Sequence, residues 1–507
     1  MTGSLFLNLA YKIFHALNIW YENSLIHRML KVLGVYCMNS RIIGGIIQFI
    51  TQKERSWAEG SLLFIIFYKT GSLVWQMVSR FYGLVKPALD GSKILKILSW
   101  DSLVLSCLRP EVALSLFVIF MSAVPAHYWN NMYSMAAAMV LVVLYGAQLL
   151  TGRENIKHRR IPVSLLLFLG VMGINLLQSP EFSDSLRVIV IFVSCVTIGI
   201  LAQNIINTEK KLELFFGAIH IGVFITGLYG LYQYWAGIEV RADLVDLLMN
   251  PGLRRVFSTM GNPNNYAKYL TLFLPFCASY AINRKTELGK IAAFGMLAPS
   301  FIALVLTSSR AAYLVIMGSA ALYVLLTNKR LVPFFILALL AAIPFIPASI
   351  IFRISTIGTD SSSLYRLMIW DGSFQALRDF WVYGIGMGPE VFIRVYRIYA
   401  QQIAINAMHS HNQFLQIWIE NGIFGFVTFM VFFLGLIRRH LSALLSLVTG
   451  KLKSYHIAAI CSLVGFAMFG MVEYVWFYPR VMLTFWIVSG ISLSLTAKII
   501  KENENAG

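Results

Sequence analysis

Charged residues are scarce in this 507-residue chain, where Asp, Glu, Lys and Arg make up 13% of the residues and apolar residues make up 58%. A soluble protein carries about twice that share of charge, because water has to solvate its surface. The composition therefore excludes an ordinary soluble enzyme. It predicts that the lipid bilayer is the solvent of most of the chain.

Cysteine pairs and metal-binding carboxylate pairs are also lacking. The five cysteines (Cys37, Cys107, Cys195, Cys277 and Cys461) show no Cys-x-x-Cys spacing, so neither a disulfide framework nor a zinc site has support. No Asp-x-Asp pair is present to hold a metal ion, and no metal or other cofactor is predicted. The first twenty residues have no basic start and no small-residue cleavage site, which argues against a secretory signal.

The net charge of +18 would suit nucleic-acid binding if it formed one basic surface. The lysines and arginines instead cluster in short loops between apolar runs, which is how membrane proteins encode their orientation. Membrane lipids are therefore the predicted surroundings of the chain, and nucleic acid is not a predicted partner.

Twelve apolar runs approach the roughly 20 residues that a helix needs to cross a bilayer. They lie at about 112–128, 132–150, 162–178, 186–206, 213–235, 266–282, 289–307, 311–327, 331–351, 412–437, 455–473 and 481–499. Strands have no place here, because an open sheet edge leaves backbone groups unsatisfied in lipid. The predicted fold class is an all-α polytopic membrane protein with about 12 transmembrane helices.

The charge of the loops alternates strictly along the chain. Loops that contain lysine (151–160, 207–211, 283–290, 327–330 and 438–453) alternate with loops that contain none (126–131, 178–185, 236–265, 307–310, 352–411 and 473–480). The positive-inside rule places the first set in the cytoplasm, together with both termini. This pattern predicts a multi-pass protein of the cytoplasmic (inner) membrane, with a long external loop between spans 9 and 10.

Residues 1–110 differ from the rest, with twelve Lys and Arg against five Asp and Glu. Their apolar runs are interrupted, as at Lys69, which predicts an amphipathic extension on the cytoplasmic leaflet. One or two extra spans are the alternative. The predicted division is this extension, spans 1–9 (111–351), an external catalytic loop (352–411), and spans 10–12 with a cytoplasmic tail (412–507).

The two longest external loops, 236–265 and 352–411, contain arginine but no lysine. A guanidinium group bonds phosphate oxygens in pairs, whereas lysine offers a point charge. These loops therefore favour a phosphate or pyrophosphate ligand. The alternative for most of these arginines is pairing with Asp360, Asp371, Asp379 or Glu390.

Three arginines are the strongest candidates for that anion site. Arg310 opens a span at the external end and has no acidic neighbour in sequence. Arg254 and Arg255 precede an Asn262-Pro263 turn, after which an asparagine can cap the next helix. All three side chains are predicted at the same external site.

The stretch 407–426, "AMHSHNQFLQIWIENGIFGF", carries two histidines where a polar loop becomes an apolar run. Ser410 and Gln413 form a predicted capping box that starts a helix at His411, while His409 precedes the helix and is expected to point elsewhere. Structural roles are predicted for four residues of this stretch. Ser410 caps the helix, and Gly422 and Gly425 would let another helix approach closely. Glu420 must be protonated or hydrogen-bonded at its depth in the membrane.

These motifs together resemble the O-antigen ligase and polymerase family of bacterial membrane glycan transferases. The signature is His-Asn, nine residues, then Gly-x-x-Gly, as in "HNQFLQIWIENGIFG" from His411 to Gly425. The resemblance extends to "TSSRAAYLV", "RVFSTMGNPNNYAKYL" and residues 365–392. It covers about residues 110–500, although Phe426 stands where the ligases often have Thr.

The resemblance implies a metal-independent enzyme that transfers a glycan from undecaprenyl pyrophosphate to an acceptor sugar hydroxyl during surface polysaccharide synthesis. The acceptor is a glycan or lipid-linked, and other polysaccharide-assembly proteins are expected partners. The essential histidine of the family corresponds to His411, the general base, and its arginines correspond to Arg310 and to Arg255 or Arg254. Candidate glycan contacts are Asn412, Gln413 and Arg366.

The choice between ligase and polymerase stays open at this point. A polysaccharide transporter or lipid-linked glycan flippase is the alternative function. Transporters place polar residues near the middle of the bilayer, whereas this sequence gathers them at one face.

Overall fold

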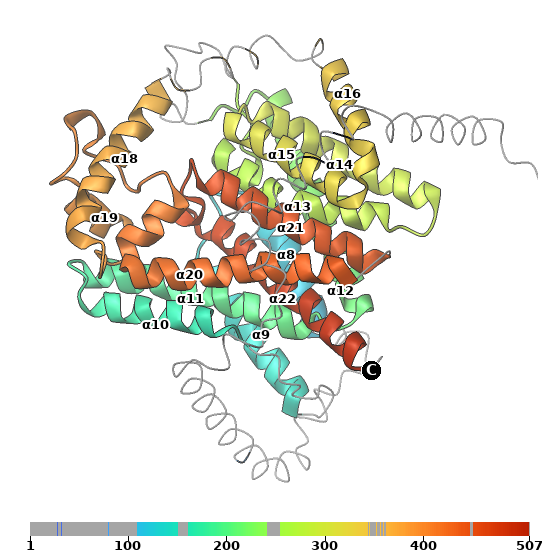
Figure 1. The fold of residues 1–507 in the computed structure, drawn as a ribbon, viewed down its shortest axis with the longest axis horizontal. Coiled ribbons are helices and arrows are strands. Elements are labelled where there is room, and N and C mark those ends of the chain that lie inside the picture. Colours follow the sequence, from blue (N-terminus) through green and yellow to red (C-terminus); the bar gives the residue numbers. More distant parts are fainter. Residues whose placement is uncertain are drawn as a thin grey trace, which may run out of the picture.

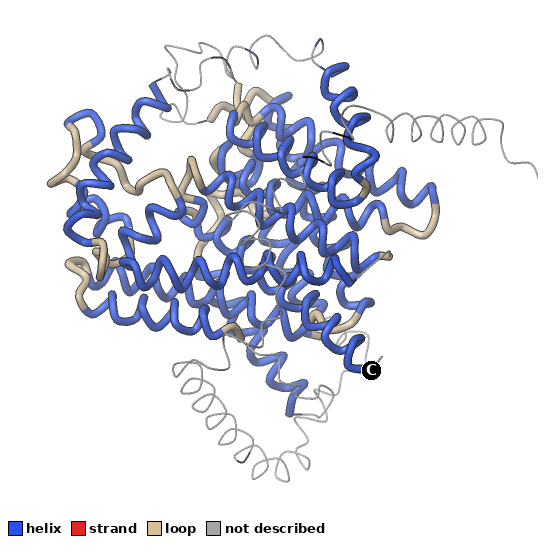
Figure 2. The backbone as a smooth tube through the Cα atoms, in the orientation of Figure 1, coloured by secondary structure: helices blue, strands red, loops and turns tan. Residues whose placement is uncertain are grey.

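The computed structural model describes residues 109–150, 161–240, 254–342, 361–446 and 450–505, with a few isolated positions besides. Within these ranges every regular element is a helix (Figures 1 and 2). The predicted N-terminal extension lies outside the described residues up to position 108, apart from isolated positions.

The helices form one bundle, with α18 and α19 at one end (Figure 1). In chain order they are α8 (Pro110–Ala123), α9 (Met132–Leu150), α10 (Val163–Leu177), α11 (Phe182–Ile205), α12 (Glu209–Trp235), η2 (Ser258–Met260), α13 (Pro263–Ile282), α14 (Glu287–Leu306), α15 (Arg310–Thr327), η3 (Lys329–Leu331), α16 (Val332–Ala342), α18 (Ser361–Phe380), α19 (Pro389–Tyr396), η5 (Gln402–Ala404), α20 (Gln413–Ser446), α21 (Lys451–Gly470), η6 (Val475–Phe477) and α22 (Pro479–Asn505).

Each of the twelve predicted apolar runs overlaps a helix of this bundle. Eight of the described helices are long and apolar enough to cross a membrane, namely α9, α11, α12, α14, α15, α20, α21 and α22. The helices α8 and α10 are apolar but shorter. A multi-pass helical membrane protein is therefore confirmed, whereas the count of twelve and the orientation stay predictions.

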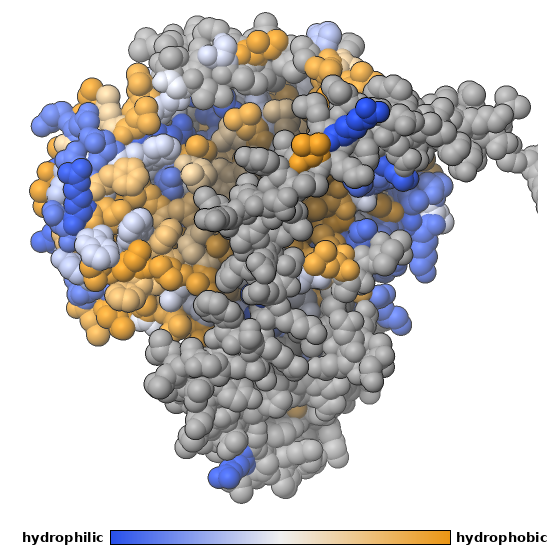
Figure 3. All heavy atoms as spheres, viewed as in Figure 1, coloured by the Kyte–Doolittle hydropathy of each residue, from blue (hydrophilic) through white to orange (hydrophobic). Residues whose placement is uncertain are grey.

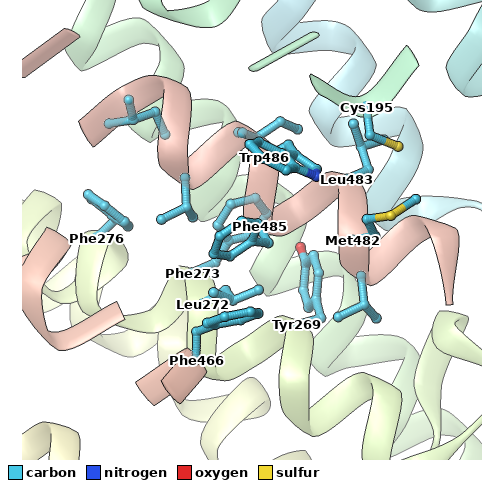
Figure 4. Packing of buried hydrophobic residues seen from close by; sticks show 14 of the residues in the cluster. Cys195, Tyr269, Leu272, Phe273, Phe276, Phe466, Met482, Leu483, Phe485 and Trp486 are labelled. Carbon is cyan, nitrogen blue, oxygen red and sulfur yellow. The ribbon is translucent and has the colours of Figure 1, made fainter. Parts of the chain in front are cut away.

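Helix α13 lies at the centre of the bundle and is buried on nearly every side, from Pro263 to Ala281. Aromatic side chains of α13, α21 and α22 pack around it, among them Phe273, Phe466 and Trp486 (Figure 4). On the other side of α22, the backbones of α11 and α22 touch, because a Cβ on Gly490 would lie 2.0 Å from the Gly199 carbonyl oxygen. Close packing of backbones is a common way to join helices in lipid.

Helices α18 and α19 form a smaller cluster with its own apolar core. Hydrophilic residues gather around this end of the molecule, whereas apolar residues dominate the surface beside it (Figure 3). The cluster is attached to the bundle through α11, because the Asp184 carboxylate accepts a hydrogen bond from the Glu390 backbone N–H (3.0 Å) and the Ser185 hydroxyl donates to the Met387 carbonyl (2.6 Å).

Helix α20 is interrupted at Gly422, which has φ 63° and ψ −173°. Residues 381–386 run alongside the interruption. The Ile423 N–H donates to the Trp381 carbonyl, and the N–H groups of Ile385 and Gly386 donate to the carbonyls of Ile419 and Glu420. This clip, residues 381–386 paired with 419–423, supplies partners for backbone groups that the interruption takes out of the helix.

The predicted role of the two glycines needs correction. The neighbour that approaches Gly422 closely is an extended loop, because a Cβ there would lie 2.1 Å from the Val382 carbonyl oxygen. At Gly425 the closest atom to such a Cβ is Cβ of Asn421 in the same helix, and Val171 of α10 lies 3.5 Å away. The sequence pattern assumed a regular helix through both positions, and the positive φ at Gly422 removes that assumption.

Replacing Gly422 by alanine is expected to destabilise the protein by roughly 2–5 kcal/mol, from backbone strain and overpacking. The matched control is Gly435→Ala in the same helix, where a Cβ meets nothing within 4 Å. Thermal unfolding of the detergent-solubilised variants measures both effects. A melting temperature for Gly422→Ala equal to that of the parent would show that the clip tolerates a side chain.

Candidate functional site

Four segments bring polar residues together at the end of the bundle that carries α18 and α19. They are the entry to α13, the 307–310 turn before α15, the 409–412 segment before α20, and the 471–478 turn between α21 and α22. Helix α18 adds Arg366. The sequence-predicted residues Arg255, Arg310, Arg366 and His411 all come from these segments.

Asn412, rather than the predicted pair of Ser410 and Gln413, caps α20. The Asn412 side-chain oxygen accepts hydrogen bonds from the N–H groups of Phe414 (3.0 Å) and Leu415 (3.1 Å), so the helix begins at Gln413. The predicted capping box is therefore wrong. Asparagine is as good an N-cap as serine, and the two alternatives are only two residues apart.

Asn412 and Gln413, the two residues of this segment predicted to contact the glycan, both bond to the 471–478 turn. The Asn412 amide donates to the Met471 carbonyl (3.0 Å), and the fully buried Gln413 accepts a hydrogen bond from the Trp476 backbone N–H (3.2 Å). The structure thus shows anchoring contacts for both side chains. A glycan contact of either residue stays a prediction.

His411 lies just before the helix in the left-handed backbone region, at φ 49°. Its side chain is 25% exposed, and its Nδ1 atom lies 3.8 Å from Oε2 of Glu473. No hydrogen bond reaches that Nδ1 atom within the described residues. One ring nitrogen therefore faces a carboxylate within ion-pair distance, without a hydrogen bond between the two groups.

His409 does not point elsewhere, as the sequence had suggested. Its ring centroid lies 4.1 Å from that of His411, and its Nδ1 atom accepts a hydrogen bond from the His411 backbone N–H (3.2 Å). Burial, with a further contribution from His411, holds the pKa of His409 well below its usual range. His409 is thus a neutral support that holds the backbone of His411.

Glu473 is the centre of the site, although its sequence surroundings alone do not single it out. Its carboxylate accepts hydrogen bonds from Arg366 (2.7 Å) and Asn264 (3.4 Å) at Oε1, and from Lys268 (3.1 Å) at Oε2. Burial favours the neutral acid, but the charges of Lys268, Arg366 and His411 outweigh it and hold the pKa of Glu473 well below its usual range. The carboxylate is ionised and shared by several partners.

The arginine candidates continue this network toward α15. Arg255 donates from Nε to the Thr307 carbonyl (2.9 Å) and from a terminal nitrogen to the Asn264 side chain (3.2 Å). Thr307 ends α14 only three residues before Arg310, the first residue of α15. Arg255 and Arg310 therefore lie at adjoining ends of two helices, and Asn264 connects Arg255 to Glu473.

Arg254 is directed differently from its neighbour. It is exposed, and its guanidinium lies beside Gly237 at the end of α12. Of the two predicted alternatives, Arg255 is the one that the structure joins to the Glu473 network.

The predicted ion pairs of the long loop are mostly different from those observed. Arg394 pairs with Glu181 and Arg366 with Glu473, both acids outside the loop. Asp371 accepts hydrogen bonds from Gln375 and Gln401, and Asp379 accepts one from Tyr399. The loop acids fix the α18–α19 cluster itself, which a count of loop charges does not reveal.

Backbone strain gathers at this site. The three non-glycine residues with positive φ in the described part of the chain are Ser258, Ser308 and His411. Ser258 follows Arg255 by three residues, and Ser308 precedes Arg310 by two. Such conformations cost about 1–3 kcal/mol each and cluster where a fixed side-chain position is needed.

Glu420 lies deeper in α20 and is buried. Its carboxyl oxygens accept hydrogen bonds from the Gln416 amide (2.9 Å) and the Tyr474 hydroxyl (3.4 Å). Gln416 also accepts a hydrogen bond from the Ser410 backbone N–H (2.6 Å). The glutamate thus braces the loop that carries His411 against the 471–478 turn.

The network of Lys268, Asn264 and Glu473 was missed because Glu473 lies more than two hundred residues from the other two in the chain. A signal for the ion pair was present nonetheless. Lys268 is the only charged residue from Pro263 to Ile282, and Glu473 is the only acidic residue of the turn that follows α21. Isolated charges of opposite sign in such surroundings usually pair. Among the described residues no group of three or more His, Cys, Asp or Glu is placed to hold a metal ion.

Comparison with known families identifies the region that contains much of this site. The O-antigen ligase family model matches residues 295–430, from within α14 to within α20. The match includes Arg310, Arg366 and His411, and it leaves out Arg255, Lys268 and Glu473. No curated protein matches the chain.

Removing the charge of Glu473 alone is expected to be costly. Glu473→Gln leaves Lys268, which is 3% exposed, as a buried cation without its carboxylate, and we expect a loss of about 3–5 kcal/mol. The double variant Lys268→Met with Glu473→Gln should recover much of this loss. Thermal unfolding in detergent measures all three proteins, and equal melting temperatures for the single and double variants would contradict the pairing.

Proposed function

We propose that this protein, whose residues 295–430 match the O-antigen ligase family model, transfers a glycan from undecaprenyl pyrophosphate to an acceptor sugar hydroxyl at the outer face of the cytoplasmic membrane. The observation that carries the proposal is the pairing of a partly exposed histidine with a buried carboxylate beside a group of arginines. This arrangement offers a base for the acceptor and positive charge for the leaving group.

The arginines bind the donor pyrophosphate in this proposal. Arg310 opens α15, so its side chain and the positive end of the helix act on the same anion. Arg255 lies at the adjoining end of α14, and Arg366 reaches the network from α18. Arg366 is held by Glu473 at one terminal nitrogen while its side chain stays 23% exposed.

His411 acts as the general base. Its Nδ1 atom faces Glu473, so Nε2 is the nitrogen that accepts the proton of the acceptor hydroxyl. The acceptor oxygen forms a bond to the anomeric carbon of the donor glycan while the bond from that carbon to the pyrophosphate oxygen breaks. The proton stays on His411, whose imidazolium form Glu473 stabilises, until it passes to water.

The departing polyprenyl pyrophosphate gains negative charge as that bond breaks. Fixed arginines beside it stabilise this charge more in the transition state than in the ground state, which is the condition for catalysis. The same role is filled by metal ions in many other transferases. In a partly buried site these interactions are stronger than they would be in water.

The position of the charges supports transfer rather than transport. Lys268, Arg366, Glu473 and His411 gather at one end of the bundle, and the residues that pack around the middle of α13 are aromatic and aliphatic. A flippase or transporter would place its polar residues near the middle of the membrane instead.

Replacing His411 by alanine tests the base directly. We expect kcat to fall by about a hundredfold to ten-thousandfold, while the donor still binds. The assay uses purified protein, a synthetic undecaprenyl-pyrophosphate-linked glycan and a glycan acceptor. The control is His127→Ala, which changes an exposed histidine on a different loop. Transfer by His411→Ala at the parental rate would place the base elsewhere.

Replacing Arg310 by lysine tests the pyrophosphate clamp. Lysine keeps the charge but loses paired bonding to phosphate oxygens, so we expect most of the transfer activity to be lost at normal membrane levels. Arg378→Lys on α18 is the matched control, because Arg378 is exposed and lies outside the network. Near-parental activity of Arg310→Lys would show that Arg310 is a charged residue at the end of a span and does not bind pyrophosphate through paired bonds.

A further inference from the structure

The proposed roles of His411 and the arginines leave Lys268 without a role in the transfer reaction. Its side chain is 3% exposed, so it is not placed to contact a substrate. Its Nζ atom donates to Oε2 of Glu473 (3.1 Å) and to the Tyr474 carbonyl (3.4 Å), and it lies 5.9 Å from the centre of the Phe469 ring. The only acidic partner that these contacts give it is Glu473.

The oxygen that Lys268 bonds is also the one that faces the histidine. Oε2 of Glu473 lies 3.1 Å from Nζ of Lys268 and 3.8 Å from Nδ1 of His411. The other oxygen, Oε1, is bonded by Arg366 and Asn264. Each carboxylate oxygen therefore has a cation, and the cation beside His411 is the buried lysine.

We propose that Lys268 is a positioning residue that acts through Glu473 to keep His411 unprotonated, with its proton on Nδ1, until the acceptor arrives. The role rests on the proposed function of His411 as a base. The reason is electrostatic: an ionised carboxylate near a histidine favours the imidazolium form, which cannot accept a proton. The positive charge of Lys268, bonded to the same Glu473 oxygen, offsets this stabilisation of the imidazolium form. The carboxylate can still orient the His411 ring.

The other groups around His411 act in known directions. From the 471–478 turn, Glu473 favours the protonated ring. From α13 and α18, Lys268 and Arg366 oppose protonation, and the adjoining His409 is buried and neutral. Arg255 is farther away, connected through Asn264.

Arg366 is not a substitute for Lys268 in this role. It is 23% exposed and belongs to the proposed donor clamp, so its charge is engaged by the pyrophosphate once the donor binds. Lys268 is enclosed by the bundle, and its Nζ atom is bonded to Glu473 rather than open to a donor. A second contact, to the Tyr474 carbonyl, fixes it to the turn that carries Glu473.

The experiment measures the protonation of His411 without using transfer activity. Diethyl pyrocarbonate modifies only the unprotonated imidazole, and peptide mass spectrometry reports the rate at each histidine as a function of pH. Lys268→Met should shift the midpoint of the His411 profile upward by about one pH unit, because the carboxylate is no longer offset. Lys268→Arg should keep the parental midpoint, and exposed His127 is the internal control.

The double variant Lys268→Met with Glu473→Gln guards against a loss of folding in the single variant. The double variant removes the negative charge of Glu473, which is nearer to His411, together with the positive charge of Lys268, which is farther away. The midpoint of the His411 modification profile should therefore fall below that of the parent. An unchanged His411 profile in Lys268→Met, or in the double variant if the single variant does not fold, would overturn the proposal.

Transfer assays on the same proteins separate this proposal from the function itself. If the parent transfers no glycan and His411 still responds to Lys268→Met, the proposed function fails and the electrostatic coupling stands. If the parent transfers glycan and His411→Ala abolishes transfer, but the modification midpoint of His411 is unchanged in Lys268→Met, only the role of Lys268 is wrong.

If the proposed function and the role of Lys268 are both correct, Lys268→Met shifts the acid limb of the pH profile of kcat/KM. That shift has the same direction as the shift in the diethyl pyrocarbonate midpoint of His411.

Discussion

The buried carboxylate of Glu473 is the contact on which the arrangement of this site depends. Removing a carboxylate from water costs several kcal/mol, and only well-placed partners compensate for it. Those partners come from two parts of the fold: Lys268 and Asn264 from the central helix α13, and Arg366 from the peripheral α18. Satisfying one charge therefore fixes the α18–α19 cluster to the helical bundle and aligns the arginines with the histidine.

The backbone around the site is strained, and this strain also fixes the positions of the site residues. Ser258, Ser308 and His411 adopt left-handed conformations just beside the residues proposed to bind and react. Packing elsewhere has to hold such turns in place, and it does so with Asn262 and Asn412 as helix caps and with the buried amides of Gln413 and Gln416. The site is preorganised by short polar contacts at the ends of helices whose middles are apolar.

The helices could be read from the sequence because an apolar run is a local property, and each of the twelve runs overlaps one. Arg255, Arg310 and His411 could be selected because each stands at a polar end of such a run. Details that depend on partners distant in sequence could not be obtained in this way. The interruption at Gly422 depends on the 381–386 segment, and the 471–478 segment contacts Asn412 and His409. The ion pair of Lys268 and Glu473 joins residues 205 positions apart, and hydropathy carries no information about such distances.

The clip at Gly422 has a consequence for the loop between α18 and α19. The turns of α20 before Gly422 are bonded through their backbone to residues 381–386, and the remainder of α20 continues as an apolar span. The first turns of α20, which follow the histidine segment, therefore share their backbone hydrogen bonds with the loop between α18 and α19. A change in the sequence of that loop would reach the histidine segment through these backbone contacts, without altering any residue of α20 itself.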